Sequence, residues 1–173
     1  GKKQPEPVPT PVNNPAPPPR VNEDSIARAR ADSIARAEAE RARAREAAIA
    51  AIVNEMAQSI HFDYDRSDVR LSDQALLDRK AEILRANPSV QIRIAGHADD
   101  RGSDEYNLAL GNRRAASAKR YLVGKGIDEG RISIISFGEE RPVDPNQSED
   151  AWARNRRAEF EITAGRDSIQ PAR

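Results

Sequence analysis

One stretch of the sequence brings acidic, basic and amide side chains together at a turn between two regular elements. It runs from Gly96 to Ala115 and reads GHADDRGSDEYNLALGNRRA. Asn107 and Arg114 lie seven residues apart, so two turns of a helix place them on one face, and Asp99 lies in the turn before them. A guanidinium is the best partner for a carboxylate, and a carboxylate for an ammonium group. Asp99 and Arg114 therefore suit a small zwitterion, and the alternative is that they pair with each other or with water.

The sequence contains few of the residues that a catalytic, metal-binding or phosphate-binding site would need. The chain has no cysteine and two histidines, His61 and His97. His97 and Asp99 together lack the spacing of a known metal motif. The sequence contains neither the Gly-x-Ser-x-Gly of serine hydrolases nor a glycine-rich phosphate loop. We therefore expect no catalysis, no metal and no cofactor, and we keep an enzyme or metal protein that uses His97 and Asp99 as an alternative.

The charge balance argues against a nucleic-acid partner. Among 173 residues, 28 are Lys or Arg and 28 are Asp or Glu, so the formal net charge is zero. No basic field exists that would attract a phosphate backbone. The sequence also lacks the run of roughly 18 apolar residues that a membrane-spanning helix needs.

Two segments precede the globular part of the chain. Residues 1–22 are rich in proline, which fixes φ and removes hydrogen-bond donors, so a disordered tether is predicted. Residues 23–57 are rich in Ala, Arg and Glu, which predicts a long charged helix of about 50 Å. An eight-residue unit that begins at Asp24 is repeated from Asp32, and this period does not match the heptad of a coiled coil. We expect a single helix whose apolar end, residues 49–56, docks on the following domain.

Strand patterns divide the segment from residue 58 to residue 163. Ile60, Phe62 and Tyr64 alternate with polar residues, which predicts a first strand with one buried face. The same reasoning predicts further strands at 90–96, 132–137 and 158–162.

Helix patterns separate these strands. Ser72 is the expected cap of a helix that ends at Asn87 and Pro88. A second helix ends near Val123, and a short one surrounds Trp152. Four residues are expected to form the buried stripe of the second helix: Leu108, Ala115, Ala118 and Leu122. Gly111 in the same helix predicts the close approach of another backbone or of a ligand.

Strands that alternate with helices predict an α/β (α+β) sandwich, in which helices cover one face of a mixed sheet. The domain is expected to span residues 58–163. Residues 164–173 are predicted to be a disordered tail.

Five segments of this domain carry a family resemblance. They are residues 60–65, GHADDRG at 96–102, YNLALGNRRA at 106–115, SFGEERP at 136–142 and NRRA at 155–158. Together they resemble the OmpA C-terminal-like domain family, and within it the peptidoglycan-associated lipoproteins (Pal). The resemblance implies a βαβαβ-type mixed sheet. It also implies non-catalytic, non-covalent binding of the peptidoglycan stem peptide through its meso-diaminopimelate residue, in the periplasm of a diderm bacterium.

The resemblance implies a role for individual residues of this sequence. Asp99 would take the ammonium end of diaminopimelate and Arg114 its carboxylate. The further site residues implied are Asn107, Asp63, Arg156, Phe62, Leu110 and Ala98. Ala98 stands where the family usually has threonine, so a hydrogen bond worth about 1 kcal/mol is missing there. Four neighbouring charges are expected to be solvated: Asp100, Arg101, Arg113 and Arg157.

The resemblance also gives the N-terminal half a role. It implies that a lipidated cysteine outside the given sequence anchors the chain in the outer membrane, on its periplasmic side, and that residues 1–57 are the tether to the cell wall. A TolB-like protein of a Tol-Pal system is an implied partner. The alternative is a structural or partner-docking periplasmic protein that acts through the helix at 23–57.

Overall fold

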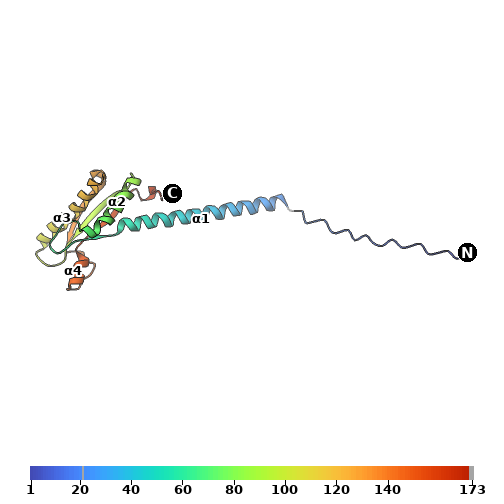
Figure 1. Ribbon diagram of the computed structural model, residues 1–173, viewed down its shortest axis with the longest axis horizontal. Coiled ribbons are helices and arrows are strands. Elements are labelled where there is room, and N and C mark those ends of the chain that lie inside the picture. Colours follow the sequence, from blue (N-terminus) through green and yellow to red (C-terminus); the bar gives the residue numbers. More distant parts are fainter. Residues whose placement is uncertain (21, 172–173) are drawn as a thin grey trace. The chain divides into compact units, whose positions relative to one another are not determined.

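The computed structural model describes residues 1–20 and 22–171 (Figure 1). Val21 and residues 172–173, which belong to the predicted tether and tail, lie outside the described residues. The chain divides into two compact units, Gly1–Arg41 and Ala42–Arg173. Residues 1–20 form no helix or strand and are exposed. The long helix α1 spans Glu23–Ala57, as the composition predicts.

A four-stranded mixed sheet forms the centre of the second unit. Its strands are β1 (Ile60–His61), β2 (Gln91–His97), β3 (Ile132–Gly138) and β4 (Arg157–Ala164). They lie in the order β1-β4-β2-β3, with β4 antiparallel to both of its neighbours and β2 parallel to β3. The predicted fold class is confirmed.

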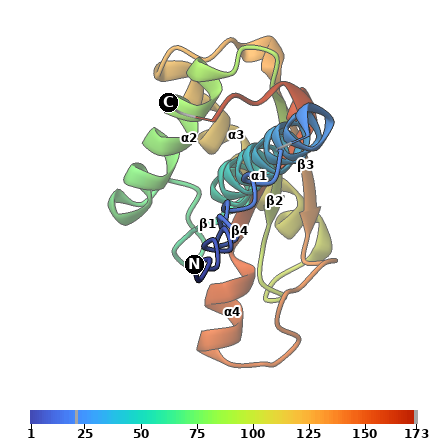
Figure 2. The same cartoon turned by 90° about the vertical axis from the view of Figure 1, so that its right-hand side faces the viewer.

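Three helices follow α1. They are α2 (Gln74–Ala86), α3 (Asp104–Gly124) and α4 (Glu149–Asn155). Ser103 and Ser148 cap α3 and α4, because each hydroxyl accepts a hydrogen bond from a backbone N–H three residues later. Figure 2 shows α2 and α3 beside the sheet and α4 beyond one end of it. The described part of the chain also contains three short 3-10 helices: Leu71–Asp73, Glu129–Arg131 and Arg166–Ser168.

The core lies between the sheet and the helices. One cluster of buried side chains joins α2, α3, all four strands of the sheet and the end of α1. Its fully buried members include Met56, Ile60, Phe62, Leu77, Leu84, Ile92, Ile94, Ala115 and Leu122. The predicted docking of the apolar end of α1 agrees with the burial of Ile49 and Met56.

Two glycines set the distance between α3 and β2. A Cβ atom on Gly96 would lie 1.7 Å from the carbonyl oxygen of Gly111, and a Cβ atom on Gly111 would lie 2.2 Å from Ser136 Oγ. The close approach predicted at Gly111 is therefore made by backbone. It brings the first half of α3 to the end of β2, where the charged turn begins.

Burial differs from the predicted patterns at two positions. Tyr64 is 59% exposed because β1 ends at His61, and the chain leaves the sheet to present carbonyl groups to Arg114. Leu108 is 48% exposed, because the buried face of α3 includes the polar residues Asn107 and Arg114. Hydrogen bonds offset part of the cost of burying these two polar side chains, so hydropathy alone misplaces the buried face.

The start of α2 and the C-terminal segment also differ from the prediction. Ser72 lies inside a 3-10 turn and does not cap α2; the Asp73 carboxylate accepts from the backbone of His61 instead, at 3.1 Å. The segment expected to be a disordered tail returns to the domain. Ile169 is fully buried in the core, and the N–H of Gln170 donates to Asn87 Oδ1 at 2.8 Å. A single apolar residue in a polar tail gives too weak a periodic signal for this contact to be predicted.

Candidate functional site

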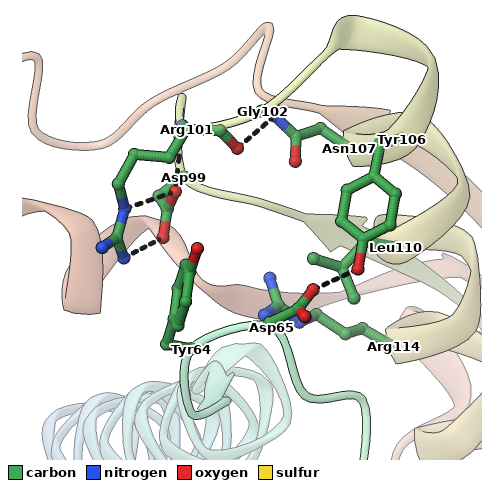
Figure 3. Close-up of a pocket in the computed structure, with 9 residues that line it drawn as sticks. All are labelled: Tyr64, Asp65, Asp99, Arg101, Gly102, Tyr106, Asn107, Leu110 and Arg114. Carbon is green, nitrogen blue, oxygen red and sulfur yellow. Dashed lines mark hydrogen bonds and ion pairs between the residues drawn. The ribbon is translucent and has the colours of Figure 1, made fainter.

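A pocket of about 150 Å³ lies at the end of β2 that carries the charged turn (Figure 3). The loop after β1, the turn after β2 and the first half of α3 form its walls. Its lining residues are Tyr64, Asp65, Asp99, Arg101, Gly102, Tyr106, Asn107, Leu110 and Arg114. The structure thus brings together four of the eight predicted site residues: Asp99, Asn107, Leu110 and Arg114.

Arg114 is fully buried at the base of the pocket and is bound by backbone alone. Its Nε donates to the carbonyl of Arg66 at 2.8 Å, its Nη1 to that of His97 at 2.9 Å, and its Nη2 to that of Asp63 at 3.2 Å. Burial lowers the pKa of Arg114 to about 10, so the group remains cationic at neutral pH. Within residues 1–20 and 22–171, no acidic side chain forms an ion pair with it. The site therefore contains a buried positive charge without a counter-ion.

Asp99 is also buried, but its charge is already paired. Arg101 donates to it three times: from the backbone N–H at 3.0 Å, from Nε at 3.2 Å and from Nη2 at 2.8 Å. Burial acts to raise the pKa of Asp99, and the hydrogen bonds from Arg101 outweigh it, so the pKa lies below its usual value. Asp99 and Arg114 do not pair with each other. The prediction that Arg101 is merely solvated is wrong, because this residue is the partner of Asp99.

Asp65 is a pocket residue that sequence reasoning missed. It has a φ of 56°, the left-handed conformation that aspartate tolerates better than most residues, and this conformation turns its side chain toward the pocket. Its carboxylate accepts a hydrogen bond from the Tyr106 hydroxyl, and this bond raises the pKa of Tyr106. Period-two alternation puts Asp63 and Asp65 on the same strand face, so only the turn after β1 distinguishes them.

Asn107 lies on the same face of α3 as Arg114, as the helical spacing predicts, and Leu110 lies between them in the pocket lining. Asn107 is buried, and its Nδ2 donates to the carbonyl of Arg101 at 3.1 Å and to Glu139 Oε1 at 3.2 Å. These bonds hold the charged turn against α3. Leu110, which is 5% exposed, forms an apolar part of the wall.

The four other predicted site residues lie outside the pocket lining. Asp63 contributes its carbonyl to Arg114, while its side chain is 71% exposed. Phe62 is fully buried beneath Arg114, with its ring centroid 5.3 Å from the guanidinium carbon. Arg156 donates to the carbonyl of Phe62 at 2.9 Å, and its Nη1 lies 3.6 Å from Asp99 Oδ2. Ala98 lines a different hollow.

The remaining charges near the site behave differently from one another. Asp100 and Arg113 are exposed, as expected. Arg157 is buried, and it donates to Glu159 at 2.6 Å and to the carbonyl of Arg141 at 2.8 Å, so the prediction of a solvated charge is wrong.

Neither a metal centre nor a membrane span is evident in the described ranges. His97 is 1% exposed, and burial lowers its pKa to about 4. Among residues 1–20 and 22–171, no group of three or more His, Cys, Asp and Glu side chains is placed to hold a metal ion. In the same part of the chain, no helix combines the length and apolar character needed to cross a bilayer.

Comparison with known proteins identifies the family. The sequence pattern of the OmpA family matches residues 61–156. A peptidoglycan-associated lipoprotein of Rhizobium meliloti is 48% identical over 99 residues, which is 57% of this chain and 56% of that protein. The same kind of lipoprotein from Pseudomonas putida is 41% identical over 117 residues, covering 68% of this chain and 67% of that one. The match thus spans little more than half the length of the first relative.

A solved structure agrees with these sequence matches. The crystal structure of the peptidoglycan-associated lipoprotein from Burkholderia pseudomallei superposes with a TM-score of 0.60 and 40% identity, covering 61% of this chain and 90% of that one. The four-stranded mixed sheet and the helices around it are therefore the fold of these relatives. The chain belongs to the OmpA family, whose members are non-enzymatic proteins.

Proposed function

We propose that this protein binds peptidoglycan non-covalently, through the meso-diaminopimelate residue of the stem peptide. The end of that side chain carries one ammonium and one carboxylate on the same carbon. It is the kind of zwitterion that a pocket with fixed acidic and basic groups recognises. The names of the relatives, all peptidoglycan-associated lipoproteins, support the proposal.

The uncompensated charge of Arg114 is the observation that carries the proposal. Three backbone carbonyls hold the guanidinium, and each terminal nitrogen keeps a second N–H for which residues 1–20 and 22–171 offer no acceptor. A buried cation without a counter-ion is unfavourable, and a ligand carboxylate that lies against those N–H groups would relieve this. Because the donors are already fixed, the ligand need not order them.

The ammonium group has two carboxylates within the same pocket. Asp99 is bound to Arg101, whereas Asp65 has no basic partner in residues 1–20 and 22–171. We infer that Asp65 shares the ammonium with Asp99, and that the exposed side chain of Asp63 takes no part in this contact. The small volume favours an amino-acid end group, since pockets for drug-sized ligands measure roughly 300 to 1,000 Å³.

Binding to purified sacculi tests the function without any mutation. Diaminopimelate-type sacculi should pull the protein down, whereas lysine-type sacculi, which lack the second carboxylate, should retain little of it. Asp65→Asn, an isosteric change at an exposed residue, should weaken the first interaction while the fold stays intact. Equal retention by both types of sacculi would refute diaminopimelate recognition.

The tether and the partner are finer parts of the same proposal. We propose that residues 1–57 link the domain to a lipid anchor in the outer membrane, on the periplasmic side, in a diderm bacterium. The gene should then encode a lipoprotein-type cysteine upstream of Gly1, and any other sequence there would contradict the anchor. A TolB-like protein that uses this pocket would compete with a soluble stem peptide.

A further inference from the structure

We propose that Trp152, which lies outside the pocket, is a positioning residue for the ligand site. It holds the Arg101 guanidinium through a cation–π contact, and through Arg101 it fixes the Asp99 carboxylate and the Tyr64 wall. The inference rests on the proposed function for its ligand, but the geometry behind it is independent of that ligand.

The Arg101 guanidinium contacts two aromatic rings. Its central carbon is 4.1 Å from the centroid of the Tyr64 ring and 4.1 Å from that of Trp152. Both distances are typical of cation–π contacts. Figure 3 shows the same guanidinium bound to Asp99, with the Tyr64 ring beside the pair. Arg101 is therefore held by two rings and by one carboxylate.

Trp152 is itself fixed from another direction. Its Nε1 donates to Asp100 Oδ1 at 3.1 Å, and Asp100 also accepts from the side chain of Gln147. Arg156, at the end of α4, donates to Glu149 at 3.2 Å and to the carbonyl of Phe62. These contacts tie the α4 segment to the turn after β2 and to the loop after β1, so Trp152 cannot turn away freely.

The loss of Trp152 would affect the Asp99 carboxylate, which has few hydrogen-bond partners other than Arg101. Asp99 is 5% exposed, so water can replace little of what Arg101 provides. The Arg101 side chain is 30% exposed, and without the indole ring one of its faces would be open to solvent. The guanidinium would then have more orientations available, and the Asp99 carboxylate would lose part of the interaction that keeps it ionised. Tyr64 would lose the contact that holds it upright as a pocket wall.

Two variants of Trp152 separate positioning from general damage. Trp152→Phe keeps a ring face for Arg101 but loses the bond to Asp100, whereas Trp152→Leu removes the ring face as well. Binding of a soluble stem peptide with meso-diaminopimelate should be about two- to fivefold weaker for Trp152→Leu, the factor for one partly exposed cation–π contact. Trp152→Phe should restore most of this loss. Trp152→Leu should also lose binding at a higher pH on acidification than the wild type does.

Carbon-detected NMR titration of the Asp99 carboxyl provides a readout that needs no ligand. The pKa of Asp99 should be higher in Trp152→Leu than in the wild type and in Trp152→Phe, with thermal unfolding used to verify that all three proteins are folded. An unchanged titration of Asp99 in folded Trp152→Leu would overturn the inference. Failure of the wild type to bind the peptide would instead overturn the proposed function, so the two failures can be told apart.

Discussion

The pairing of Arg114 with the ligand carboxylate is tested most directly by a double-mutant cycle, in which the guanidinium and the carboxylate are removed separately and together. Arg114→Met keeps an unbranched, mostly apolar stem and deletes the guanidinium with its charge. Three backbone carbonyls then lose their hydrogen-bond donor. Each loss lowers the free energy of unfolding by about 1 kcal/mol, a figure that already allows for the gain from no longer burying a cation. The expected loss of about 3 kcal/mol is smaller than the roughly 5 to 15 kcal/mol that stabilise typical domains, so the variant should remain folded.

The ligand is varied by comparing a stem peptide that contains meso-diaminopimelate with one that contains lysine. The wild type should bind the first about 30- to 150-fold more tightly, which corresponds to about 2 to 3 kcal/mol for a hydrogen bond between charged groups. Arg114→Met should bind the two peptides almost equally. Isothermal titration calorimetry gives both ratios. Each ratio is measured within one protein, so any partial unfolding of the variant cancels.

Arg101→Met provides the matched control, because Arg101 is the other cation of the pocket. Both peptides carry the ammonium group, so this variant should weaken both by the same factor and keep the preference for diaminopimelate. If Arg114→Met kept the full preference while Arg101→Met lost it, the carboxylate would bind at Arg101. The assignment of the two poles would then be wrong.

Three further predictions concern stability. Burial lowers the pKa of His97 to about 4, so on acidification the unfolded chain binds a proton at this imidazole before the folded chain does. The free energy of unfolding should therefore fall by about 3 kcal/mol as the pH drops from about 6.5 to 4. Urea titrations of His97→Gln should not show this part of the pH dependence. Gly96→Ala should abolish cooperative folding, since its Cβ would lie 1.7 Å from a Gly111 oxygen, whereas Gly124→Ala, with open space around the Cβ, should be neutral or slightly stabilising by circular dichroism. Ile169→Ala should cost about 2 to 4 kcal/mol in the same measurement, and a neutral effect would mean that the tail does not pack.

The fold could be predicted well because its signals are local and repeated. Alternation at Ile92 and Ile94, and at Ala158 and Phe160, marks strands whose apolar side chains are indeed buried. A helix between two strands in a parallel crossover follows from the order of the elements. Local patterns fail where burial depends on residues that are distant in the sequence. Ile169 is an example, because it packs in the core formed by residues 49–160.

The site was predicted less completely, for a physical reason. Helical spacing predicts that Asn107 and Arg114 share one face of α3, because the period of a helix is fixed, and both residues line the pocket. Leu110, which only the family resemblance indicated, lies in the same lining. The loop after β1 has no such period. Its conformation depends on Arg114, which draws two of its carbonyl groups inward, and on Asp65 in a left-handed conformation. Neither contact can be derived from the sequence of the loop.

The two poles of the pocket therefore differ in how much of their charge is free. Asp99 is matched by Arg101 within the protein, whereas Arg114 is surrounded by carbonyl groups that are polar but carry no net charge. A ligand ammonium at Asp99 must share an occupied carboxylate, while a ligand carboxylate at Arg114 meets donors that are fixed and unused. Selectivity should follow the carboxylate for this reason, and the ammonium should orient the ligand through Asp65 and Asp99. Both poles are present in the sequence, but which of them is open depends on Arg101, two residues after Asp99, and on the rings of two other segments that contact it.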